Sequence, residues 1–305
     1  MDEAGHIPVL LDAVLDQLDP RPGLTFLDVT LGLGGHAAAI LPRLAPAGRY
    51  IGFDRDPGQL DAARGRLEPI AHEHGVALDL VHADFANARD ALDRLGVERV
   101  DRLLADLGFA SNQVGVPERG LSFKHDGPLD MRLDPTGGAT AAELLDTLSE
   151  REIADVLYEL GEERLSRKIA RKIVERRGRE PIRSTRQLAE LARAAYGPRG
   201  RNQRIDPATR TFQALRIAVN DELAALDRLL RDLQRIVSPE GKAGLISFHS
   251  LEDRRVKQAL ADLEARGRGR RATRKPVTAD DAEAHANPRS RSAKLRVFAF
   301  AGSTA

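Results

Sequence analysis

The chain has 305 residues, of which 42% are hydrophobic, and its formal net charge is only +1. Such a composition can fill the core of a globular protein. The absence of cysteine excludes disulfides and thiolate metal sites, and no apolar stretch is long enough to cross a membrane. The N-terminal eight residues are acidic and lack the apolar run of a signal peptide, so we expect a cytoplasmic protein with no membrane partner.

The first elements of the chain predict a ligand pocket. An amphipathic helix is expected over residues 11–18, a buried strand over 24–29 and a helix over 37–44. Gly32, Gly34 and Gly35 therefore fall in the turn between strand and helix. Glycine permits positive φ and close approach of a ligand, and the start of a helix offers unpaired N–H groups.

Two ligands compete for this turn. Gly32-x-Gly34-x-x-Ala37 satisfies the dinucleotide fingerprint, which is a weak signal by itself. S-adenosylmethionine (SAM) is the other candidate, because Asp28 at the end of the strand could balance its sulfonium and amino charges and would repel a pyrophosphate. A glycine-rich turn with no ligand is the third interpretation.

Further strands and helices alternate after the turn. Strands are expected over residues 50–54, 76–82 and 100–106, with a helix from Pro57 to about residue 67 and another over 88–95 with Asn87 as its N-cap. This alternation predicts a parallel sheet with right-handed crossovers, whose carboxyl edge binds ligands. Four acids fall at that edge, and the second of them stands where Rossmann-like folds bind ribose hydroxyls: Asp28, Asp54, Asp84 and Asp106.

The middle of the chain predicts a helical insertion. Residues 107–132 are loop-like, but their spaced apolar side chains indicate an ordered loop. Helices are expected over 141–148, 150–158, 162–177 and 185–195, the last capped by Ser184, and the charged positions of 162–172 suggest a solvated face. We thus expect an inserted helical substrate-recognition domain at 139–205, with 1–138 and 206–305 forming one discontinuous domain.

The remaining chain is expected to complete the sheet. A long helix is predicted over residues 209–237, a strand over 245–248, a helix over 251–263, a short strand over 274–277 and a last strand over 295–300. Arginines cluster at 197–204, 266–275 and 287–294, where they either contact phosphates or lie in solvated loops.

Longer motifs extend along almost the whole chain. They comprise Asp28-x-Thr-x-Gly-x-Gly-Gly-His36, Asp54-x-Asp56, Asp106-Leu-Gly108 with Ser111-x-Gln113, Asp126-Gly-Pro-Leu-Asp-Met-Arg132, Phe212-Gln-Ala-Leu-Arg-Ile217 with Asn220, Ser247-Phe-His-Ser-Leu-Glu-Asp-Arg254 and Asn287-Pro-Arg-Ser-Arg-Ser-Ala-Lys294. In these motifs the sequence resembles the bacterial 16S rRNA cytosine-N(4) methyltransferases, the RsmH/MraW family. Phe109 and Ala110 depart from the residues more usual in that family.

The resemblance implies an α/β fold, a class I SAM-dependent methyltransferase (Rossmann-like) sheet with an inserted all-α domain. It implies an enzyme that methylates the 4-amino group of a cytidine near the decoding centre, with 16S rRNA in the small ribosomal subunit as partner and no metal. Oligomeric state stays open, a homodimer included. The cofactor-binding residues that it implies are Gly34, Gly35, His36, Asp54, Phe85, Asp106 and Gln113.

Little acid–base chemistry is needed, because the sulfonium already activates the methyl group and the enzyme mainly aligns the attacking nitrogen. The catalytic residue is unknown from sequence. Acceptors that orient the cytosine amine could be Asp106, Asp130 or carbonyls of the 107–109 turn, although Asp130 could equally brace its loop through Arg132. His249 more readily suits a structural hydrogen bond than a substrate contact. A nicotinamide dehydrogenase and a non-enzymatic RNA-binding protein remain alternatives.

Overall fold

The computed structural model describes residues 8–108, 111–203 and 205–302. Contacts within the chain define two compact units. The first comprises Met1–Gly108 with Leu223–Ala305, and the second comprises Phe109–Glu222. The helical segment that we expected at 139–205 falls inside the second unit, whose bounds are wider on both sides.

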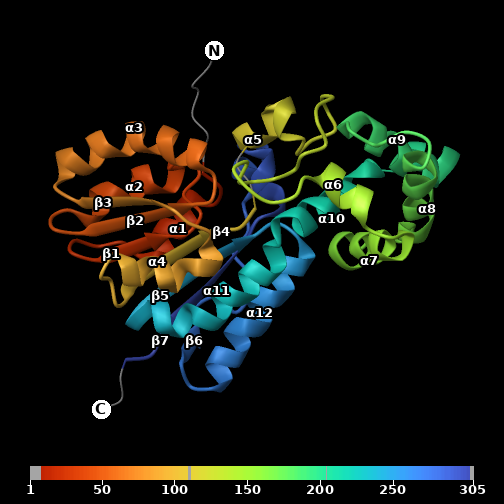
Figure 1. Cartoon of the computed structure of the whole chain (residues 1–305). Helices are drawn as coiled ribbons and strands as arrows, with labels where there is room; N and C mark the ends of the chain where they lie inside the picture. The colour runs from red at the N-terminus through yellow and green to blue at the C-terminus, as the bar shows by residue number, and fades with distance from the viewer. Residues whose placement is uncertain (1–7, 109–110, 204, 303–305) are drawn as a thin grey trace. The chain divides into compact units, whose positions relative to one another are not determined.

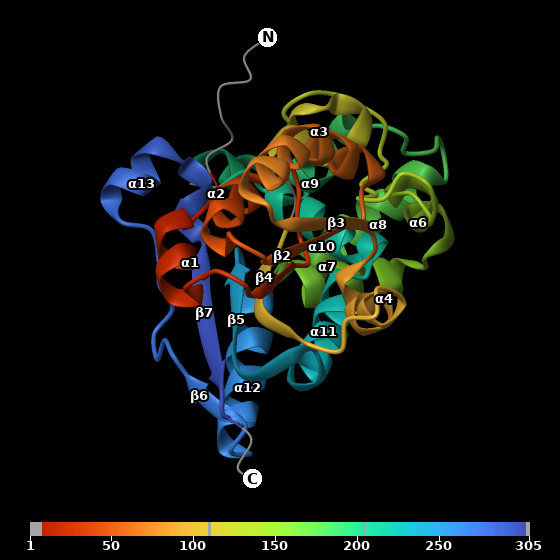
Figure 2. The same ribbon diagram turned by 90° about the vertical axis from the view of Figure 1, so that its left-hand side faces the viewer.

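The first unit is built on one seven-stranded sheet, shown in Figures 1 and 2. Its strands are β1 (Thr25–Asp28), β2 (Arg49–Asp54), β3 (Ala77–His82), β4 (Val100–Asp106), β5 (Val237–Ser247), β6 (Gly269–Arg271) and β7 (Lys294–Phe300). They lie in the order β3-β2-β1-β4-β5-β7-β6; the first five strands are mutually parallel, and β7 is antiparallel to both its neighbours. The order reverses between β1 and β4, the switch point at which open α/β sheets bind ligands.

Helices cover both faces of this sheet, which explains why its central strands are apolar without alternation. One core packs side chains of α1 (Leu11–Leu18), α2 (Gly35–Leu44) and α3 (Pro57–His74) on the sheet, and Phe26 there stacks on Tyr50 with ring centroids 5.5 Å apart. The other core packs α4 (Ala88–Arg94), α11 (Glu222–Ile236) and α12 (Ser250–Ala265). Shorter elements are η1 (Phe85–Asn87), α13 (Asp281–Ala286) and η4 (Pro288–Ser292). The predicted α/β fold, a Rossmann-like and mostly parallel sheet covered by helices on both faces, is thus confirmed.

The described residues of the second unit form helices and loops, and the β pairing among them is one isolated bridge between Pro128 and Ser184. It contains α5 (Ser111–Gly115), η2 (Pro117–Arg119), α6 (Ala141–Thr147), α7 (Glu150–Gly161), α8 (Ser166–Arg177), α9 (Thr185–Tyr196), η3 (Gly197–Asn202) and α10 (Ala208–Asn220). Leu121, Leu129 and Met131 join its core, so the described part of the loop after β4 is packed, as expected. Ser184 caps α9 through a reciprocal capping box with Gln187.

The prediction of one continuous helix over 209–237 is wrong, because Asp221 adopts a left-handed conformation with φ of 50° and separates α10 from α11. Within the second unit, Asn220 explains where α10 ends. Its side-chain amide donates to the Met131 carbonyl oxygen at 2.8 Å, and its Oδ1 accepts from the Leu133 N–H at 2.7 Å. The apolar periodicity runs on through the break, so the pattern alone could not reveal it.

The predicted helix over 162–177 begins late, at Ser166, because Glu162 is also left-handed with φ of 49°. Glu163 is fully buried and accepts hydrogen bonds from the Tyr196 hydroxyl at 2.8 Å to each carboxylate oxygen. The interpretation of 162–172 as an entirely solvated face is therefore wrong at Glu163.

Smaller corrections concern local signals. The short strand expected at 274–277 lies earlier in the chain, as β6 within the Gly/Arg run. Its first residue has to be glycine, because a Cβ on Gly269 would lie 2.1 Å from the Ala299 carbonyl oxygen. Val277 forms only an isolated bridge with Leu295. The helix from Pro57 continues past residue 67 to His74, and Asn87 makes no side-chain cap for α4. Among the described residues, no helix combines the length and the apolar character that crossing a bilayer would require.

Candidate functional site

The glycine turn joins β1 to α2 at the switch point. Gly32 and Gly34 have φ of 53° and 72°, and Gly34 is the N-cap of α2, which starts at Gly35. A Cβ at Gly34 would lie 2.8 Å from Leu67 Cδ1, whereas one at Gly32 would meet open space. Glycine is thus required at 34 by packing and by backbone conformation, while Gly32 leaves room beside the backbone.

His36 lies in the first turn of α2 and is buried. Its Nε2–H donates to the Val9 carbonyl oxygen at 3.0 Å, since a carbonyl can only accept. The imidazole therefore ties the segment before α1 to the glycine turn, a structural role that the sequence did not reveal. His6, which precedes this segment, lies outside the described residues.

Asp54 ends β2 and braces the same turn. Its Oδ2 accepts from the Gly32 N–H at 2.7 Å, and its Oδ1 accepts from the Asp56 N–H at 2.8 Å. Burial raises the pKa of Asp54, although these two hydrogen bonds oppose that effect. A carboxylate has about four acceptor positions, so two remain for ligand hydroxyls.

Asp28 ends β1, but its carboxylate is satisfied within the protein. It accepts from the Tyr50 hydroxyl at 2.9 Å and from the Thr30 N–H at 3.0 Å, and the residue is only 1% exposed. Burial raises the pKa of Asp28 to about 6. Asp28 can therefore act on a cation at the turn through its charge, whereas direct contact would require it to leave these partners.

Asp106 ends β4, the strand beside β1, and differs from the other acids. Its carboxylate oxygen Oδ1 is buried without a hydrogen-bond partner among the described residues. Burial raises the pKa of Asp106 to about 7, with Asp28 and Glu252 adding to the rise and Arg289 opposing it. Because buried acceptors in native proteins are nearly always satisfied, this oxygen is suited to a ligand donor.

Asp84, the remaining acid of the four predicted at the edge of the sheet, has a structural role. Asp84 caps η1 by accepting from the Ala86 N–H at 2.8 Å, and it pairs with Arg55 at 3.4 Å. Phe85 begins η1 and packs, partly buried, against the core on one face of the sheet. The cap therefore fixes the position of Phe85 directly after β3.

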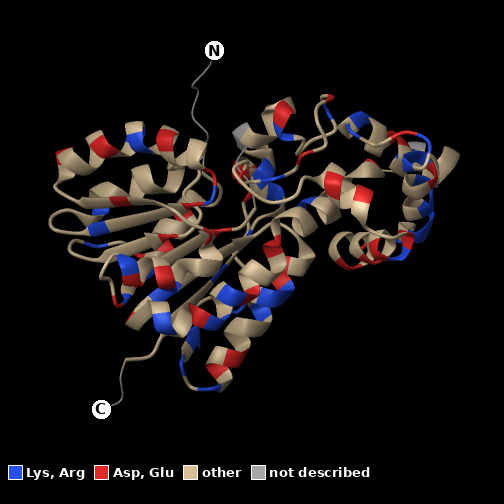
Figure 3. Cartoon of the chain, in the orientation of Figure 1, with Lys and Arg blue, Asp and Glu red and all other residues tan. Residues whose placement is uncertain are grey.

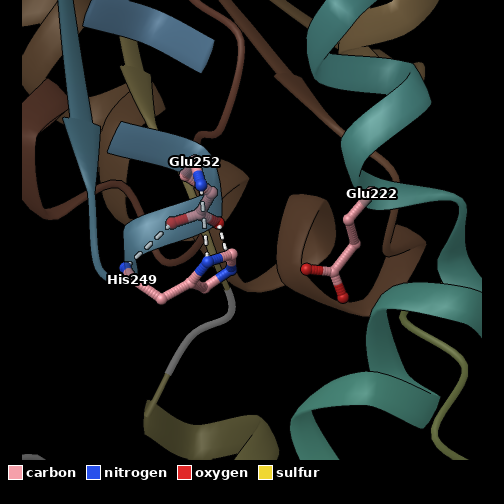
Figure 4. A group of neighbouring side chains, drawn as sticks. All are labelled: Glu222, His249 and Glu252. Atoms are coloured by element: carbon pink, nitrogen blue, oxygen red, sulfur yellow. Dashed lines mark hydrogen bonds and ion pairs between the residues drawn. The ribbon is translucent and has the colours of Figure 1, made fainter. Parts of the chain in front are cut away.

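His249 follows β5 and is the N-cap of α12, as Figure 4 illustrates. Its Nδ1 accepts from the Glu252 N–H at 3.4 Å, and Glu252 Oε1 lies 3.1 Å from His249 Nε2. Glu252 in turn accepts from the Phe248 N–H at 2.9 Å. This is the structural role that the sequence favoured for His249.

In the second unit, Arg132 holds Asp130 from both sides, with Nε to Oδ1 and Nη2 to Oδ2 distances of 2.8 Å. Although burial acts to raise the pKa of Asp130, the hydrogen bonds from Arg132 outweigh it and the pKa is lowered. The structure thus favours the loop-bracing interpretation of Asp130. Gln113 is buried on α5, while Phe109 and Ala110 lie outside the described residues.

The C-terminal basic segments divide into buried and exposed cations. Arg289 is half-buried, and Lys294 and Arg296 pair with Asp253 at 3.5 and 2.7 Å. Arg266, Arg268 and Arg270 are exposed. Cations of the 287–294 segment are thus partly used inside the protein; near β6, Arg271 pairs with Glu264 at 2.6 Å, whereas Arg266, Arg268 and Arg270 face solvent.

Comparison with known proteins shows the family to which this chain belongs. The model of the MraW methylase family matches residues 3–301. Ribosomal RNA small subunit methyltransferase H of Synechococcus sp. (strain CC9605) is 50% identical over 301 residues, covering 97% of this chain and 98% of that protein. The protein of the same name from Symbiobacterium thermophilum is 48% identical over 306 residues, covering 95% of each. This chain belongs to the MraW methylase family.

Proposed function

We propose that the protein transfers a methyl group from SAM to the 4-amino group of a cytidine in 16S rRNA, near the decoding centre. The observation that carries this proposal is the buried, unpartnered Asp106 oxygen at the switch point, beside a glycine turn that leaves space at Gly32. The relatives' names, which state a methyltransferase of small-subunit rRNA, support the substrate class.

SAM would lie against the turn between β1 and α2. The Gly34 N–H already donates to the Leu31 carbonyl oxygen, so the donors proposed for the carboxylate of the methionyl portion are the N–H groups of Gly35 and His36 in the first turn of α2, with Gly34 allowing close approach of the ligand. Asp54 would accept from the ribose hydroxyls with its two remaining acceptor positions. Phe85 and Gln113 complete the proposed contacts. The negative charges of Asp28 and Asp106 would favour the cationic sulfonium and disfavour a dinucleotide pyrophosphate.

The transfer needs alignment and a proton acceptor. SAM would supply a methyl group activated by its sulfonium; the cytosine N4 would take that methyl group as the carbon–sulfur bond breaks, S-adenosylhomocysteine would leave, and Asp106 would accept the proton that N4 gives up. Asp106 Oδ1 would accept a hydrogen bond from N4, turning the lone pair toward the methyl group and stabilising the developing positive charge. A pKa of about 7 suits an acceptor that works near neutral pH.

Incubation with radiolabelled SAM and 16S rRNA from a strain lacking the modification tests the function. We expect label in one nucleoside, N(4)-methylcytidine, and loss of transfer in Asp106→Asn at SAM concentrations that saturate this variant, whose SAM binding should be weaker than the parent's but still measurable. Label on another base, on carbon 5 of cytosine or on protein would contradict the proposal.

A further inference from the structure

A groove lies between α11 and α12 in the first unit, and it is separate from the glycine turn. It has a volume of about 500 Å³ and is lined mainly by polar and charged side chains of these two helices. The apolar part of the groove is formed by Leu230, Ala259 and Leu263, and the side chains of Leu230 and Leu263 are buried. The two helices run side by side in Figure 1, so the groove follows their length.

The acids of the groove are already engaged by its own donors. Asp227 pairs with Arg255, with Nε 3.3 Å from Oδ1, and Asp262 accepts from the Gln258 side-chain amide at 2.9 Å. Arg255 thus neutralises Asp227, whereas Asp262 keeps its negative charge because the amide of Gln258 is neutral.

Two cations of the groove have no such partner. Arg231 on α11 and Arg266 at the end of α12 are exposed, and neither guanidinium forms an ion pair or hydrogen bond with a described residue. Exposed Arg268 and Arg270 follow Arg266 directly along the chain. Figure 3 colours the ribbon by residue type and shows both blue basic and red acidic positions along α11 and α12. Once Asp227 and Arg255 are paired, Arg231 and Arg266 outweigh Asp262, so the lining of the groove carries a net charge of +1.

We propose that this groove binds the sugar–phosphate backbone of the RNA substrate, through Arg231 and Arg266. The proposal rests on the proposed function, because that function supplies the RNA. Planar guanidinium groups bind phosphate oxygens in a bidentate manner, and such contacts position a nucleic acid without reading its sequence.

A protein partner suits the groove less well. Protein interfaces depend on buried aromatic and large apolar anchors. The exposed large hydrophobic residues among the described part of the chain are Val116, Tyr158 and Ile205, and none of them lies on α11 or α12. The chemistry of the groove therefore favours a polyanion.

The test compares two double variants of the full chain. Arg231→Gln/Arg266→Gln removes the groove cations, and Arg43→Gln/Arg66→Gln removes two exposed cations from α2 and α3, which cover the opposite face of the sheet. Binding of unmodified 16S rRNA transcript is measured between 50 and 300 mM salt. Each lost phosphate contact lowers the slope of log K against log salt by roughly 0.7–0.9, so the groove variant should lose about 1.4–1.8 units. The control should keep the parent slope.

Calorimetric SAM titration and thermal melts should be unchanged in both variants, and Arg231→Lys/Arg266→Lys should keep most of the salt slope. A groove variant with the slope and affinity of the control would overturn the proposal. So would a variant that loses binding to intact small subunits but keeps binding to bare rRNA, because its occupant would then be a ribosomal protein. Failure of the proposed function is distinct, since it appears as absent methyl transfer by the parent chain.

Discussion

Asp106 is the residue whose charge state should control cofactor affinity. Burial raises its pKa to about 7, with Asp28 and Glu252 adding to the effect and Arg289 opposing it. Its ionised form attracts the sulfonium of SAM, so SAM binding should tighten as pH rises from 6 to 8 and should release a proton. Calorimetric titration in two buffers of different ionisation enthalpy measures both effects, and Asp106→Asn should flatten the pH dependence.

Ionisation of Asp106 should strengthen SAM binding but should lower the folding stability of the SAM-free protein. A carboxyl whose pKa is raised on folding binds protons more tightly in the folded state, so stability falls as pH rises from about 4 through 7. Asp28, with a pKa of about 6, contributes in the same direction. Melting temperatures of the SAM-free protein should therefore decline over this range, and less steeply in Asp106→Asn. Equal slopes in both proteins would show that Asp106 is not the titrating group.

Asp54 accepts a hydrogen bond from the backbone of the glycine turn and, we propose, hydrogen bonds from the ribose hydroxyls of SAM. Asp54→Ala leaves the Gly32 and Asp56 N–H groups without their acceptor, at a cost of roughly 1–3 kcal/mol for each buried group. Loss of charged hydrogen bonds to ribose should weaken SAM binding by at least about tenfold. Calorimetry and melts separate the two effects, and Asp54→Asn should fall between. A folded Asp54→Ala protein that binds SAM as tightly as the parent would show that Asp54 stabilises the glycine turn but does not bind the ribose.

At the scale of elements, the start of α2 depends on Gly34. Gly34→Ala would place a Cβ 2.8 Å from Leu67 Cδ1 and would force alanine into φ of 72°, which costs roughly 1–2 kcal/mol before any clash. We expect a lower melting temperature and weaker SAM binding. Gly65→Ala on α3 is the matched control, since its Cβ would meet no atom within 4 Å and alanine favours helix. Equal melts for the two variants would contradict this account.

Elements encoded by local patterns could be predicted, and those fixed by distant contacts could not. The strand ends at Asp28, Asp54 and Asp106 and the glycine turn all follow from neighbouring residues. The break at Asp221 depends on Asn220, whose partners Met131 and Leu133 lie almost ninety positions earlier.

Buried polar pairs were invisible for the same reason. Tyr50 satisfies Asp28, and Tyr196 satisfies Glu163, in each case across tens of residues. A single sequence gives no signal that two such positions meet. The sequence predicted only that Asp106 lies at the edge of the sheet. That its Oδ1 lacks a hydrogen-bond partner among the described residues depends on every group that packs around it.

At the scale of the whole molecule, the contacts of α10 determine where the chain can be cut. Phe212 and Leu215 of α10 and Leu129 and Met131 of the preceding loop belong to the same core as α6 to α9. Deleting 139–205 would remove those helices and expose the remaining apolar side chains. We therefore expect that deletion to yield an aggregating protein, which static light scattering and cosolvent-dependent solubility would reveal.

Removing the whole of Phe109–Glu222 and joining its ends with a short Gly-Ser linker should instead leave the seven-stranded sheet with both its cores. We expect a cooperative melt and retained SAM binding, weakened by up to about tenfold because the proposed Gln113 hydrogen bond is lost at roughly 0.5–1.5 kcal/mol. Gln113→Ala in the full chain should weaken SAM binding equally. Methyl transfer to rRNA should be absent, because we expect the helical segment 139–205, which this deletion removes, to recognise the substrate together with the groove between α11 and α12. A folded first unit that binds no SAM would place more of the cofactor site in the second unit, and one that still methylates rRNA would remove the recognition role from it.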